Sequence, residues 1–371
     1  MSKRTLDAFF KPKTTTPPTK RPKPTPTADN SPPHSTEDIT APDTHPSYPS
    51  PIPQLPSHIS IALTHGTPAK EPRAINNQPD LDLLYFQPYI TRPTANELFK
   101  FLRRELPFYR VKYTIKRGGI ETEINTPRYT TVFGVDDTSQ FTSYRDIKSK
   151  NKNEDEDDED ETTNPNENSI NSSSNLSLTE TTSKTPIRNT KYQYTPRPIP
   201  TCLNQLKARV EAATGSRYNS CLVNYYSSGN DSIAFHSDDE RFLGASPDIA
   251  SLSLGGEREF VMKHKPVPPR HTGSTTSLTS TSTSASPSTA GTTLKFPLSS
   301  GDMILMRGST QSNWLHSIPK RKGRSGEAVE GRINITFRRA MVPAGTNNYY
   351  RYNVGDGGVW RWDGGRGRWF V

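Results

Sequence analysis

Cysteine, apolar residues and long hydrophobic runs are all scarce in this sequence of 371 residues. The cysteines, Cys202 and Cys221, are too few for a disulfide framework or a thiolate zinc site, which is typical of a reducing compartment. Only 30% of the residues are hydrophobic and 34 are prolines, so much of the chain cannot bury a core. No apolar run approaches the roughly 20 residues of a membrane span, and the first residues lack the apolar centre of a secretory signal. We therefore expect a soluble, intracellular protein with no membrane partner, whose folded part is smaller than the chain.

The charge balance is basic, with a formal net charge of +9 at pH 7. This excess exists despite an acidic block at residues 154–161, so the rest of the chain is more basic than the total suggests. An anionic partner such as nucleic acid is compatible with this balance. A merely soluble basic protein explains it equally well, so charge alone does not decide between them.

Several polar segments interrupt the chain and have the composition of disordered protein. Residues 1–80 are rich in Pro, Thr and Ser, residues from about 146 to 186 contain the acidic block, and residues from about 267 to 293 are mostly Ser and Thr. What remains is about 200 residues, the size of one compact domain. We expect this domain over residues 81–345, with both insertions as surface loops, followed by an aromatic, Gly-rich and basic extension over residues 346–371.

Short β-branched and aromatic runs with a period of two dominate the remaining pieces. They predict strands within residues 221–229, 248–256, 258–265, 301–308 and 331–339. Helical patterns are confined to residues 94–106 and 201–214, each of which begins at a threonine. Since the helices precede most of the strands, we predict a mostly β fold, a β-sandwich or jelly roll, supported by one or two N-terminal helices.

The stretch FHSDDER, residues 235–241, contains a His-x-Asp triplet. On a strand, alternate side chains point to the same face, so His236 and Asp238 can ligate one ion. Such triplets often arise by chance, and a lone His316 in the apolar stretch NWLHSIPK is more often a core residue than a ligand. Two histidines and one carboxylate with open positions match the Fe(II) centre of non-heme oxygenases, whereas a structural zinc site needs a closed tetrahedral set.

The stretch RINITFRR predicts a strand with two unlike faces. One face carries Arg332, Asn334, Thr336 and Arg338, and the other carries apolar residues that belong to the core. Because an unpaired buried charge is costly, the arginines are either paired with carboxylates or reserved for an anionic ligand. A dicarboxylate would satisfy both, since a guanidinium matches a carboxylate in two parallel hydrogen bonds. A structural ion pair with an acid such as Asp238 is the alternative for one of them.

Taken together, these motifs resemble the AlkB family of Fe(II)- and 2-oxoglutarate-dependent dioxygenases, in particular its eukaryotic members that repair alkylated DNA. VNYYSSGNDSIAFHSDDE, IASLSLGGEREFVMKHK, GDMILMRGSTQSNWLHSIPK and RINITFRR follow in the family's order between roughly residues 80 and 341. The family fold is a double-stranded β-helix, or jelly roll, which agrees with the predicted strands. The resemblance implies His236, Asp238 and His316 as ligands of Fe(II), and Asn224, Tyr226, Arg332, Asn334, Thr336 and Arg338 as residues that bind 2-oxoglutarate. It places Arg332 at the distal carboxylate and Arg338 near the metal.

The same resemblance implies oxidative demethylation of N-alkylated bases in DNA, such as 1-methyladenine and 3-methylcytosine. Fe(II), 2-oxoglutarate and O2 would be used, and formaldehyde and succinate released. Asp239 and Glu240 would face the damaged base, Tyr194 or Tyr192 would stack on it, and Arg128 would lie over the nucleotide. These bases carry a fixed positive charge that acids complement, and because they cannot pair they flip out more easily. The alternative for Asp239 and Glu240 is an exposed acidic turn, and the alternative for Tyr194 and Tyr192 is a position on the surface.

The stretch YTIKRGGIETEINTPRYTT is expected to form a hairpin with Lys116 and Arg117 near its tip. A basic tip can grip phosphate but is a poor wedge between bases, so single-stranded DNA and RNA stay open as substrates. The C-terminal extension could pack on the core or stack on unpaired bases. The rival functions are an oxygenase acting on RNA or protein, and a non-catalytic nucleic-acid-binding protein that keeps the fold.

The stretch KRTLDAFFKPK resembles the motif with which replication proteins bind the sliding clamp PCNA. Leu6, Phe9 and Phe10 would fill the clamp's pocket, although Lys3 stands where the motif usually has Gln. An incidental apolar cluster is the alternative. The basic run TKRPKP at residues 19–24 is compatible with nuclear import. We expect a monomer located in the nucleus.

Overall fold

The computed structural model describes residues 41–64, 68–143, 176–187, 190–266, 292–321 and 331–371. Within these ranges, no helix is both long enough and apolar enough to cross a membrane. The clamp-motif residues Leu6, Phe9 and Phe10 lie outside the described residues.

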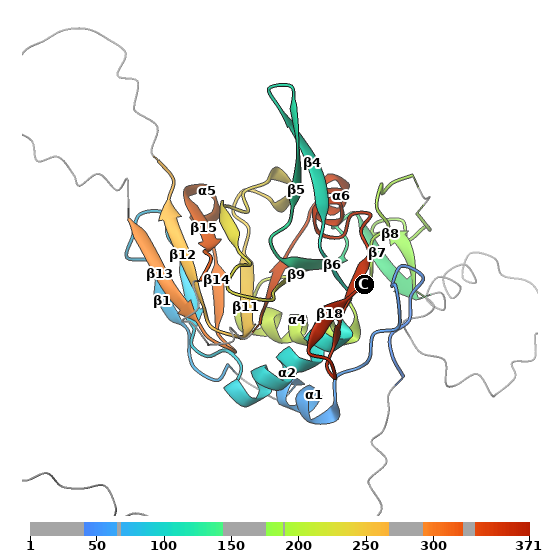
Figure 1. Ribbon diagram of the computed structural model, residues 1–371, viewed down its shortest axis with the longest axis horizontal. Coiled ribbons are helices and arrows are strands. Elements are labelled where there is room, and N and C mark those ends of the chain that lie inside the picture. The colour runs from blue at the N-terminus through green and yellow to red at the C-terminus, as the bar shows by residue number, and fades with distance from the viewer. Residues whose placement is uncertain (1–40, 65–67, 144–175, 188–189, 267–291, 322–330) are drawn as a thin grey trace, which may run out of the picture. The chain divides into compact units, whose positions relative to one another are not determined.

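Antiparallel sheets contain more of the described chain than the helices do (Figure 1). The larger sheet has ten strands in the order β1-β2-β14-β11-β16-β9-β6-β3-β17-β18. In this order they are Arg73–Ile75, Leu83–Phe86, Met303–Met306, Ile249–Gly255, Arg332–Arg338, Ser220–Tyr226, Tyr129–Gly134, Phe108–Tyr109, Val359–Asp363 and Arg368–Phe370. The smaller sheet has the order β10-β15-β12-β13 and consists of Ile233–His236, Trp314–Ile318, Arg258–His264 and Thr293–Leu298. The prediction of a mostly β, jelly-roll fold is confirmed.

Separate hairpins and helices complete the described elements. The hairpins pair β4 (Lys112–Arg117) with β5 (Ile120–Asn125) and β7 (Ser139–Ser143) with β8 (Leu176–Glu180). The helices are α1 (Ser57–Thr64), α2 (Arg92–Glu105), α4 (Thr201–Thr214), α5 (Thr310–Asn313) and α6 (Pro343–Asn353), with a 3-10 turn η1 (Arg241–Leu243). The predicted helices at residues 94–106 and 201–214 correspond to α2 and α4.

The helices α1, α2 and α4 pack together on one face of the larger sheet (Figure 1). Leu98 of α2, Leu203 of α4 and Ile335 of β16 belong to one buried apolar cluster. A second cluster, which includes Tyr226 of β9 and Phe260 of β12, lies between the larger and the smaller sheet. Polar side chains of the larger sheet that face this second layer are therefore enclosed by protein on both sides.

Strand β16 has the two faces that its sequence predicts. Ile333, Ile335 and Phe337 belong to the cluster on the helix side. The alternating polar residues Arg332 and Arg338 are also buried, so they lie on the opposite face, towards the smaller sheet. Because the strand alternates, its polar residues Arg332, Asn334, Thr336 and Arg338 lie in a row inside the jelly roll.

The expectation that residues 1–80 form a disordered tail is corrected for residues 41–64 and 68–80. Ile52, Ile59 and Leu63 are buried in the helix-side cluster. The Asp43 carboxylate accepts hydrogen bonds from the backbone N–H of Thr201 and, at 3.0 Å, from its hydroxyl, which caps the start of α4. These few apolar residues, which lie in a proline-rich stretch, pack the segment against the helix-side cluster.

The insertions and the C-terminal extension also differ from their expected bounds. The range expected as an insertion up to residue 186 contains β8, which pairs with β7. The extension does not stand apart, because β17 pairs with β3 of the larger sheet. Trp369 of β18 stacks on Tyr129 with ring centroids 4.9 Å apart. The sequence left open whether this extension packs on the core or stacks on bases. Its Trp360 and Trp369 pack on the core.

Candidate metal centre and substrate pocket

The residues of the His-x-Asp triplet and the distal histidine meet at one point. His236 ends β10 and His316 lies in β15, and the two strands pair so that these residues are opposite each other. One ligand atom each from His236, Asp238 and His316 lies within 4.8 Å of the other two. Asp238 follows the end of β10, so the expected strand through residue 238 stops two residues early. The three ligand atoms still converge, because Asp238 is buried and hydrogen-bonded to Gln311 and Arg338.

The charge states of these side chains fit a divalent metal. His236 Nδ1 lies 2.9 Å from the carbonyl oxygen of Ala234, to which only a protonated Nδ1 can donate, so Nε2 is left as a ligand atom. Burial lowers the pKa of His316 to about 3, which keeps this imidazole neutral. Its Nδ1 has no hydrogen-bond partner among the described residues. Two neutral imidazoles and one carboxylate are the donor set of a non-heme Fe(II) site.

Asp238 is held in place as an ion by Arg338. Burial opposes ionisation, but the guanidinium, with Nη2 2.8 Å from Oδ2, outweighs it and keeps the pKa of Asp238 below its usual range. The same pair raises the pKa of Arg338 although burial opposes this. The backbone N–H of Asp238 donates to Gln311 Oε1 at 2.9 Å. The sequence left two alternatives for the arginines of β16, an anionic ligand or a structural ion pair. Arg338, which lies beside the metal centre, forms a structural ion pair.

Arg332 differs from Arg338 because no carboxylate pairs with it among the described residues. Its side chain is 1% exposed. Nη2 donates to Ser253 Oγ at 2.8 Å, while Nε and Nη1 have no partner in the described chain. Burial lowers its pKa to about 10. The guanidinium lies 5.3 Å from the centre of the Tyr226 ring. A buried cation without an acidic partner is what an anionic ligand would complete.

Arg258 is a functional candidate that the sequence analysis missed. It is buried in β12, its guanidinium lies 5.6 Å from the centre of the Tyr226 ring, and it donates to the carbonyl oxygens of Ser228, Asp231 and Pro319. It therefore places a second buried cation at the same ring as Arg332. The available signal was an arginine at an inward position of the alternating strand REFVMKH.

A cavity of about 260 Å³ opens at the metal centre. The predicted residues that line it are His236, Asp238, His316, Asn224, Tyr226, Asn334, Thr336, Arg338, Glu240 and Arg128. Arg128 Nε donates to Asn224 Oδ1 at 2.7 Å. Arg332 is not part of this lining, and it approaches the cavity through Tyr226, which is. One cavity thus joins the metal residues to most of the residues expected to bind 2-oxoglutarate.

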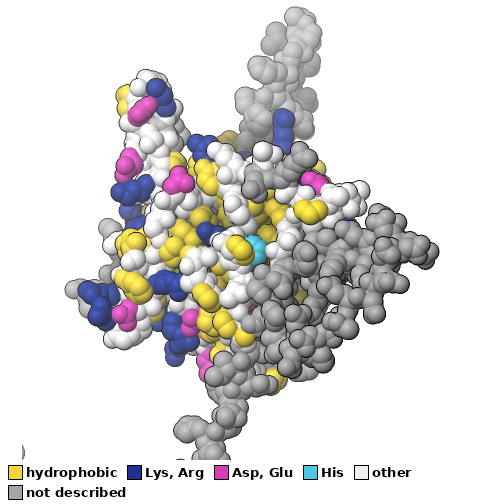
Figure 2. Space-filling model, turned by 90° about the vertical axis from the view of Figure 1, so that its right-hand side faces the viewer, with side chains coloured by type: hydrophobic (Ala, Val, Ile, Leu, Met, Phe, Trp, Pro, Cys, Tyr) yellow, Lys and Arg dark blue, Asp and Glu magenta, His cyan; other side chains and the backbone are white. Residues whose placement is uncertain are grey.

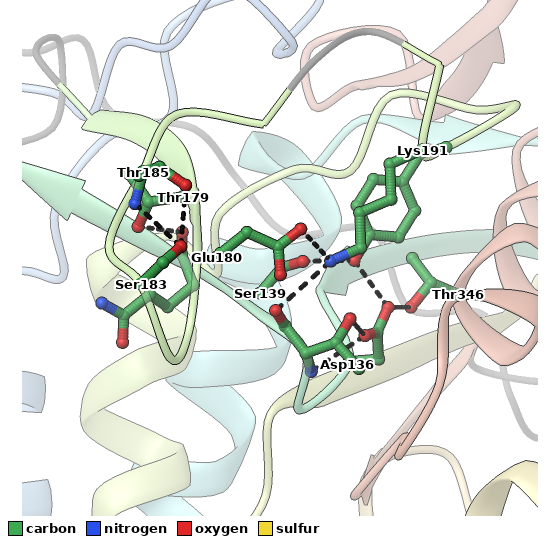
Figure 3. Close-up of polar contacts among 11 residues, drawn as sticks. Asp136, Ser139, Thr179, Glu180, Ser183, Thr185, Lys191 and Thr346 are labelled. Carbon is green, nitrogen blue, oxygen red and sulfur yellow. Dashed lines mark hydrogen bonds and ion pairs between the residues drawn. The ribbon is translucent and has the colours of Figure 1, made fainter.

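The expectation that Tyr192 stacks on a base is corrected by the structure, whereas for Tyr194 it stays a prediction. The Tyr192 hydroxyl is buried and hydrogen-bonds to Asp136 Oδ2 at 2.8 Å and to Ser139 Oγ at 2.7 Å. Figure 3 shows Asp136 in a polar network with Ser139 and Thr346. Tyr194 packs against the cluster that contains Tyr350, and neither tyrosine lines the cavity. The buried contacts of Tyr192 come from distant residues, which the local sequence does not reveal, while Tyr194 is only partly buried.

The two acids after Asp238 have different surroundings. Asp239 is 2.5 Å from Lys265 Nζ and does not line the cavity, so the alternative of an exposed acidic turn applies to it. Glu240 does line the cavity, and its Oε2 is buried with no partner among the described residues. Burial, followed by the nearby Asp238, raises the pKa of Glu240. Only Glu240 is placed to meet a substrate in the cavity.

The basic tip of the β4–β5 hairpin is partly neutralised. The hairpin projects from the rest of the structure (Figure 1). Lys116 is exposed near its tip with Nζ 3.4 Å from Glu121 Oε1, and the side chain of Arg117 is outside the described part. Such an exposed pair contributes little stability and leaves Lys116 available to solvent.

Charge of both signs is mixed on the face of the molecule that Figure 2 shows. Figure 2 shows a face on which Lys and Arg side chains lie among acidic and hydrophobic ones instead of forming one patch. The net charge of +9 belongs to the whole chain, including residues that the structure does not describe. The total charge therefore does not locate a binding site for an anionic partner.

The cavity also contains aromatic residues that the sequence analysis did not single out. They are Tyr113 of β4, Phe260 of β12, and Tyr349 and Tyr352 of α6. The signal in the sequence was the aromatic run NNYYRYN, which could not be assigned to either the core or the site. Helix α6 brings part of the C-terminal extension to the cavity.

Comparison with known proteins agrees with this geometry. A family model described as the 2OG-Fe(II) oxygenase superfamily matches residues 145–338. Alpha-ketoglutarate-dependent dioxygenase alkB homolog 3 of Rattus norvegicus is 41% identical over 133 residues, which are 36% of this chain and 39% of the relative. DNA oxidative demethylase ALKBH2 is 38% identical in Arabidopsis thaliana, over 37% of this chain and 42% of the relative. In Homo sapiens it is 33% identical, over 40% of this chain and 49% of the relative.

These matches have limited extent. The chain spans less than half the length of each of these relatives, 39%, 42% and 49%. A solved structure described as the structure of OsALKBH1 has a TM-score of 0.33 and 14% identity, covering 72% of this chain and 100% of its own, a score too low to support a statement about the fold. The family model nevertheless covers more than half of the sequence, and the resemblance seen in the motifs is confirmed. The chain belongs to the 2OG-Fe(II) oxygenase superfamily, whose cofactors are Fe(II) and 2-oxoglutarate, and within it the chain is similar to members of the AlkB family.

Proposed function

We propose that this protein removes N-linked methyl groups oxidatively from bases of DNA, such as 1-methyladenine and 3-methylcytosine. The observation that carries the proposal is the cluster of His236, Asp238 and His316, which opens on a cavity lined by Glu240, whose Oε2 has no hydrogen-bond partner among the described residues. Relatives named DNA oxidative demethylase support DNA as the substrate.

The residues in and beside the cavity hold the metal or bind the co-substrate. His236, Asp238 and His316 hold Fe(II), which together with 2-oxoglutarate and O2 supplies the oxidising power that hydroxylates an N-methyl carbon, releasing succinate, CO2 and formaldehyde. Arg332, with its two unpaired nitrogens, binds the distal carboxylate of 2-oxoglutarate. Arg338 keeps Asp238 ionised and oriented.

The polar strand faces bind and orient the co-substrate. Asn334 Nδ2 donates to Ser251 Oγ at 2.9 Å and to the Leu252 carbonyl oxygen at 3.0 Å, which fixes its amide against β11. Its Oδ1 accepts from the Thr336 hydroxyl at 3.3 Å. Such fixed side chains hold a ligand without reorganising, which preorganises the site. The surrounding protein layers exclude bulk water from the reacting groups.

The proposal is tested by measuring formaldehyde release. Single-stranded and duplex oligonucleotides with 1-methyladenine, the matching RNA, and an N-methylated peptide are each incubated with Fe(II) and 2-oxoglutarate. Wild-type protein is expected to release formaldehyde from DNA, and the His236→Ala variant to release none, because a metal ligand is lost. Release from RNA or peptide alone would replace the DNA proposal by one of an oxygenase for those substrates. If His236→Ala matched the wild type, the metal assignment would fail.

The contrast between Glu240 and Asp239 gives a further prediction. We expect Glu240→Gln to raise KM for a 1-methyladenine oligonucleotide about 10-fold, equivalent to ~1.4 kcal/mol, because the cationic base loses its complementary charge. The variant Asp239→Asn is the matched control and should change KM by less than about 2-fold, since its carboxylate faces Lys265 at the surface. Equal effects of the two substitutions would show that Glu240 does not face the base.

Location in the nucleus, a monomeric state and PCNA binding through Leu6, Phe9 and Phe10 stay predictions. They concern residues outside the described structure or properties of the whole protein.

A further inference from the structure

Helix α6 is fixed on the core at several points. The Thr346 hydroxyl donates to the buried carboxylate of Asp136 at 2.7 Å (Figure 3). The Tyr350 hydroxyl accepts from the backbone N–H of Arg197 at 2.7 Å and lies 3.0 Å from the carbonyl oxygen of Gly134. A Cβ at Gly345 would lie 2.2 Å from the Phe242 ring, so the helix approaches η1 as closely as glycine allows. The position of α6 is therefore determined by buried contacts.

Tyr349 and Tyr352, three residues apart on α6, both line the cavity. The Tyr349 ring lies 5.6 Å from the Arg338 guanidinium and packs edge-to-face on Phe242 at 5.3 Å. Its hydroxyl is buried with no hydrogen-bond partner among the described residues. Tyr349 thus forms the inner wall next to the metal end.

Tyr352 marks the mouth of the cavity. It is 38% exposed, whereas the metal ligands Asp238 and His316 are 7% and 6% exposed. Its ring meets Tyr113 of the β4–β5 hairpin edge-to-face, with centroids 5.4 Å apart at 75°. The exposed Arg351 guanidinium lies 5.3 Å from the centre of the Tyr352 ring. Two tyrosines from distant parts of the chain and one cation therefore meet at the opening.

An exposed aromatic ring that packs on a second, partly buried one beside a cation is an arrangement that can bind an unpaired nucleobase. Every base offers a π face for stacking, and a nearby cation complements the phosphate backbone. Of the two tyrosines expected to stack, Tyr192 is buried in a hydrogen-bond network, and Tyr194 is partly buried and does not line the cavity. The mouth is where described aromatic side chains lie on the route to the metal.

We propose that the C-terminal helix α6 completes the substrate site, with Tyr352 and Tyr113 forming the surface on which an unpaired nucleobase of a single-stranded nucleic acid stacks. This rests on the proposed function, which it deepens by assigning the aromatic contact to a segment beyond the strands that carry the family's motifs. Tyr352 contacts the substrate and not the metal, so it governs KM.

The test compares full-length variants at Tyr352 with a control. Tyr352→Ala is expected to raise KM for a single-stranded 1-methyladenine oligonucleotide, and Kd for the same sequence without the methyl group, about 10-fold or more. Tyr352→Phe should keep both within about 2-fold, because the ring is retained. Phe370→Ala removes another exposed aromatic of the C-terminal segment, 47% exposed and outside the cavity lining, and should change neither.

Further readouts separate stacking from a structural role. Succinate formed without nucleic acid should be equal in the wild type and Phe370→Ala, and in the Tyr352 variants it reports whether the metal and 2-oxoglutarate site is intact. Tyr352→Leu retains apolar bulk without the π face, so wild-type affinity in this variant would overturn the proposal. Equal losses in Tyr352→Ala and Phe370→Ala would also overturn it.

The outcome also distinguishes this inference from the proposed function. If the wild type demethylates the oligonucleotide and Tyr352→Ala has the same KM and Kd, only the stacking assignment fails. If the wild type releases no formaldehyde from any methylated oligonucleotide, the proposed function fails. The Kd for the unmodified single strand then still decides whether Tyr352 binds a base.

Discussion

Replacing Asp238 with alanine is expected to reduce turnover by a factor of at least about 1,000, equivalent to ~4 kcal/mol of barrier, and to destabilise the metal-free protein. Turnover falls because a metal ligand is lost. Stability falls because the buried guanidinium of Arg338, which lies 2.8 Å from Asp238 Oδ2, loses its partner. Removing one member of a buried ion pair lowers the free energy of unfolding by about 3–5 kcal/mol. Nucleic-acid binding should be retained, since the mouth of the cavity is unchanged.

The two effects are measured separately. Denaturant unfolding in the presence of a chelator reports stability without any contribution from bound metal. Glu259→Ala is the matched control, because its carboxylate pairs with Lys295 at 3.6 Å on an exposed strand surface. Its unfolding free energy should change by at most about 1 kcal/mol. If Asp238→Ala were as stable as this control, the buried pair would not stabilise the fold. Turnover equal to that of the wild type would overturn the assignment of Asp238 as a metal ligand, and absence of turnover in both proteins would favour a non-catalytic binding protein.

Features with a local period were predictable from the sequence. Strand β16 alternates strictly, so its period of two is enough to assign Ile335 and Arg338 to opposite faces. The same period placed His236 correctly on a strand, and Thr201 marked the start of α4. In each case the information lies within a few neighbouring residues, because strand and helix geometry repeat at short range.

Features set by contacts between distant segments were not predictable in this way. Tyr192 and Tyr352 are both tyrosines in polar, aromatic stretches, yet one is buried against Asp136 and the other is at the cavity mouth. Asp239 and Glu240 are adjacent acids, yet Asp239 pairs with Lys265 at the surface whereas Glu240 lines the cavity. A residue's neighbours in sequence do not specify which distant group meets it, so such assignments need the fold.

The most informative single substitution in the co-substrate site is Arg332→Met. We expect 2-oxoglutarate affinity to fall at least about 100-fold, because the distal carboxylate loses a desolvated bidentate partner, a loss of ~2–5 kcal/mol. Without 2-oxoglutarate, stability should move in the opposite direction. Arg332 is 1% exposed and has no carboxylate partner among the described residues, so its burial carries an uncompensated desolvation penalty. Methionine avoids this penalty, and the unfolding free energy should be equal or higher by up to about 4 kcal/mol.

Arg338→Met is the matched control, since it removes the same charge from the same strand face. There the lost guanidinium leaves Asp238 buried and unpaired, so stability should fall by about 3–5 kcal/mol. Calorimetric titration with 2-oxoglutarate and denaturant unfolding of both variants check the two signs. A loss of stability in Arg332→Met as large as in Arg338→Met would mean that Arg332 is a structural cation. If Arg332→Met raises the unfolding free energy while Arg338→Met lowers it, Arg332 is a buried cation that binds an anionic ligand and lowers the stability of the free protein.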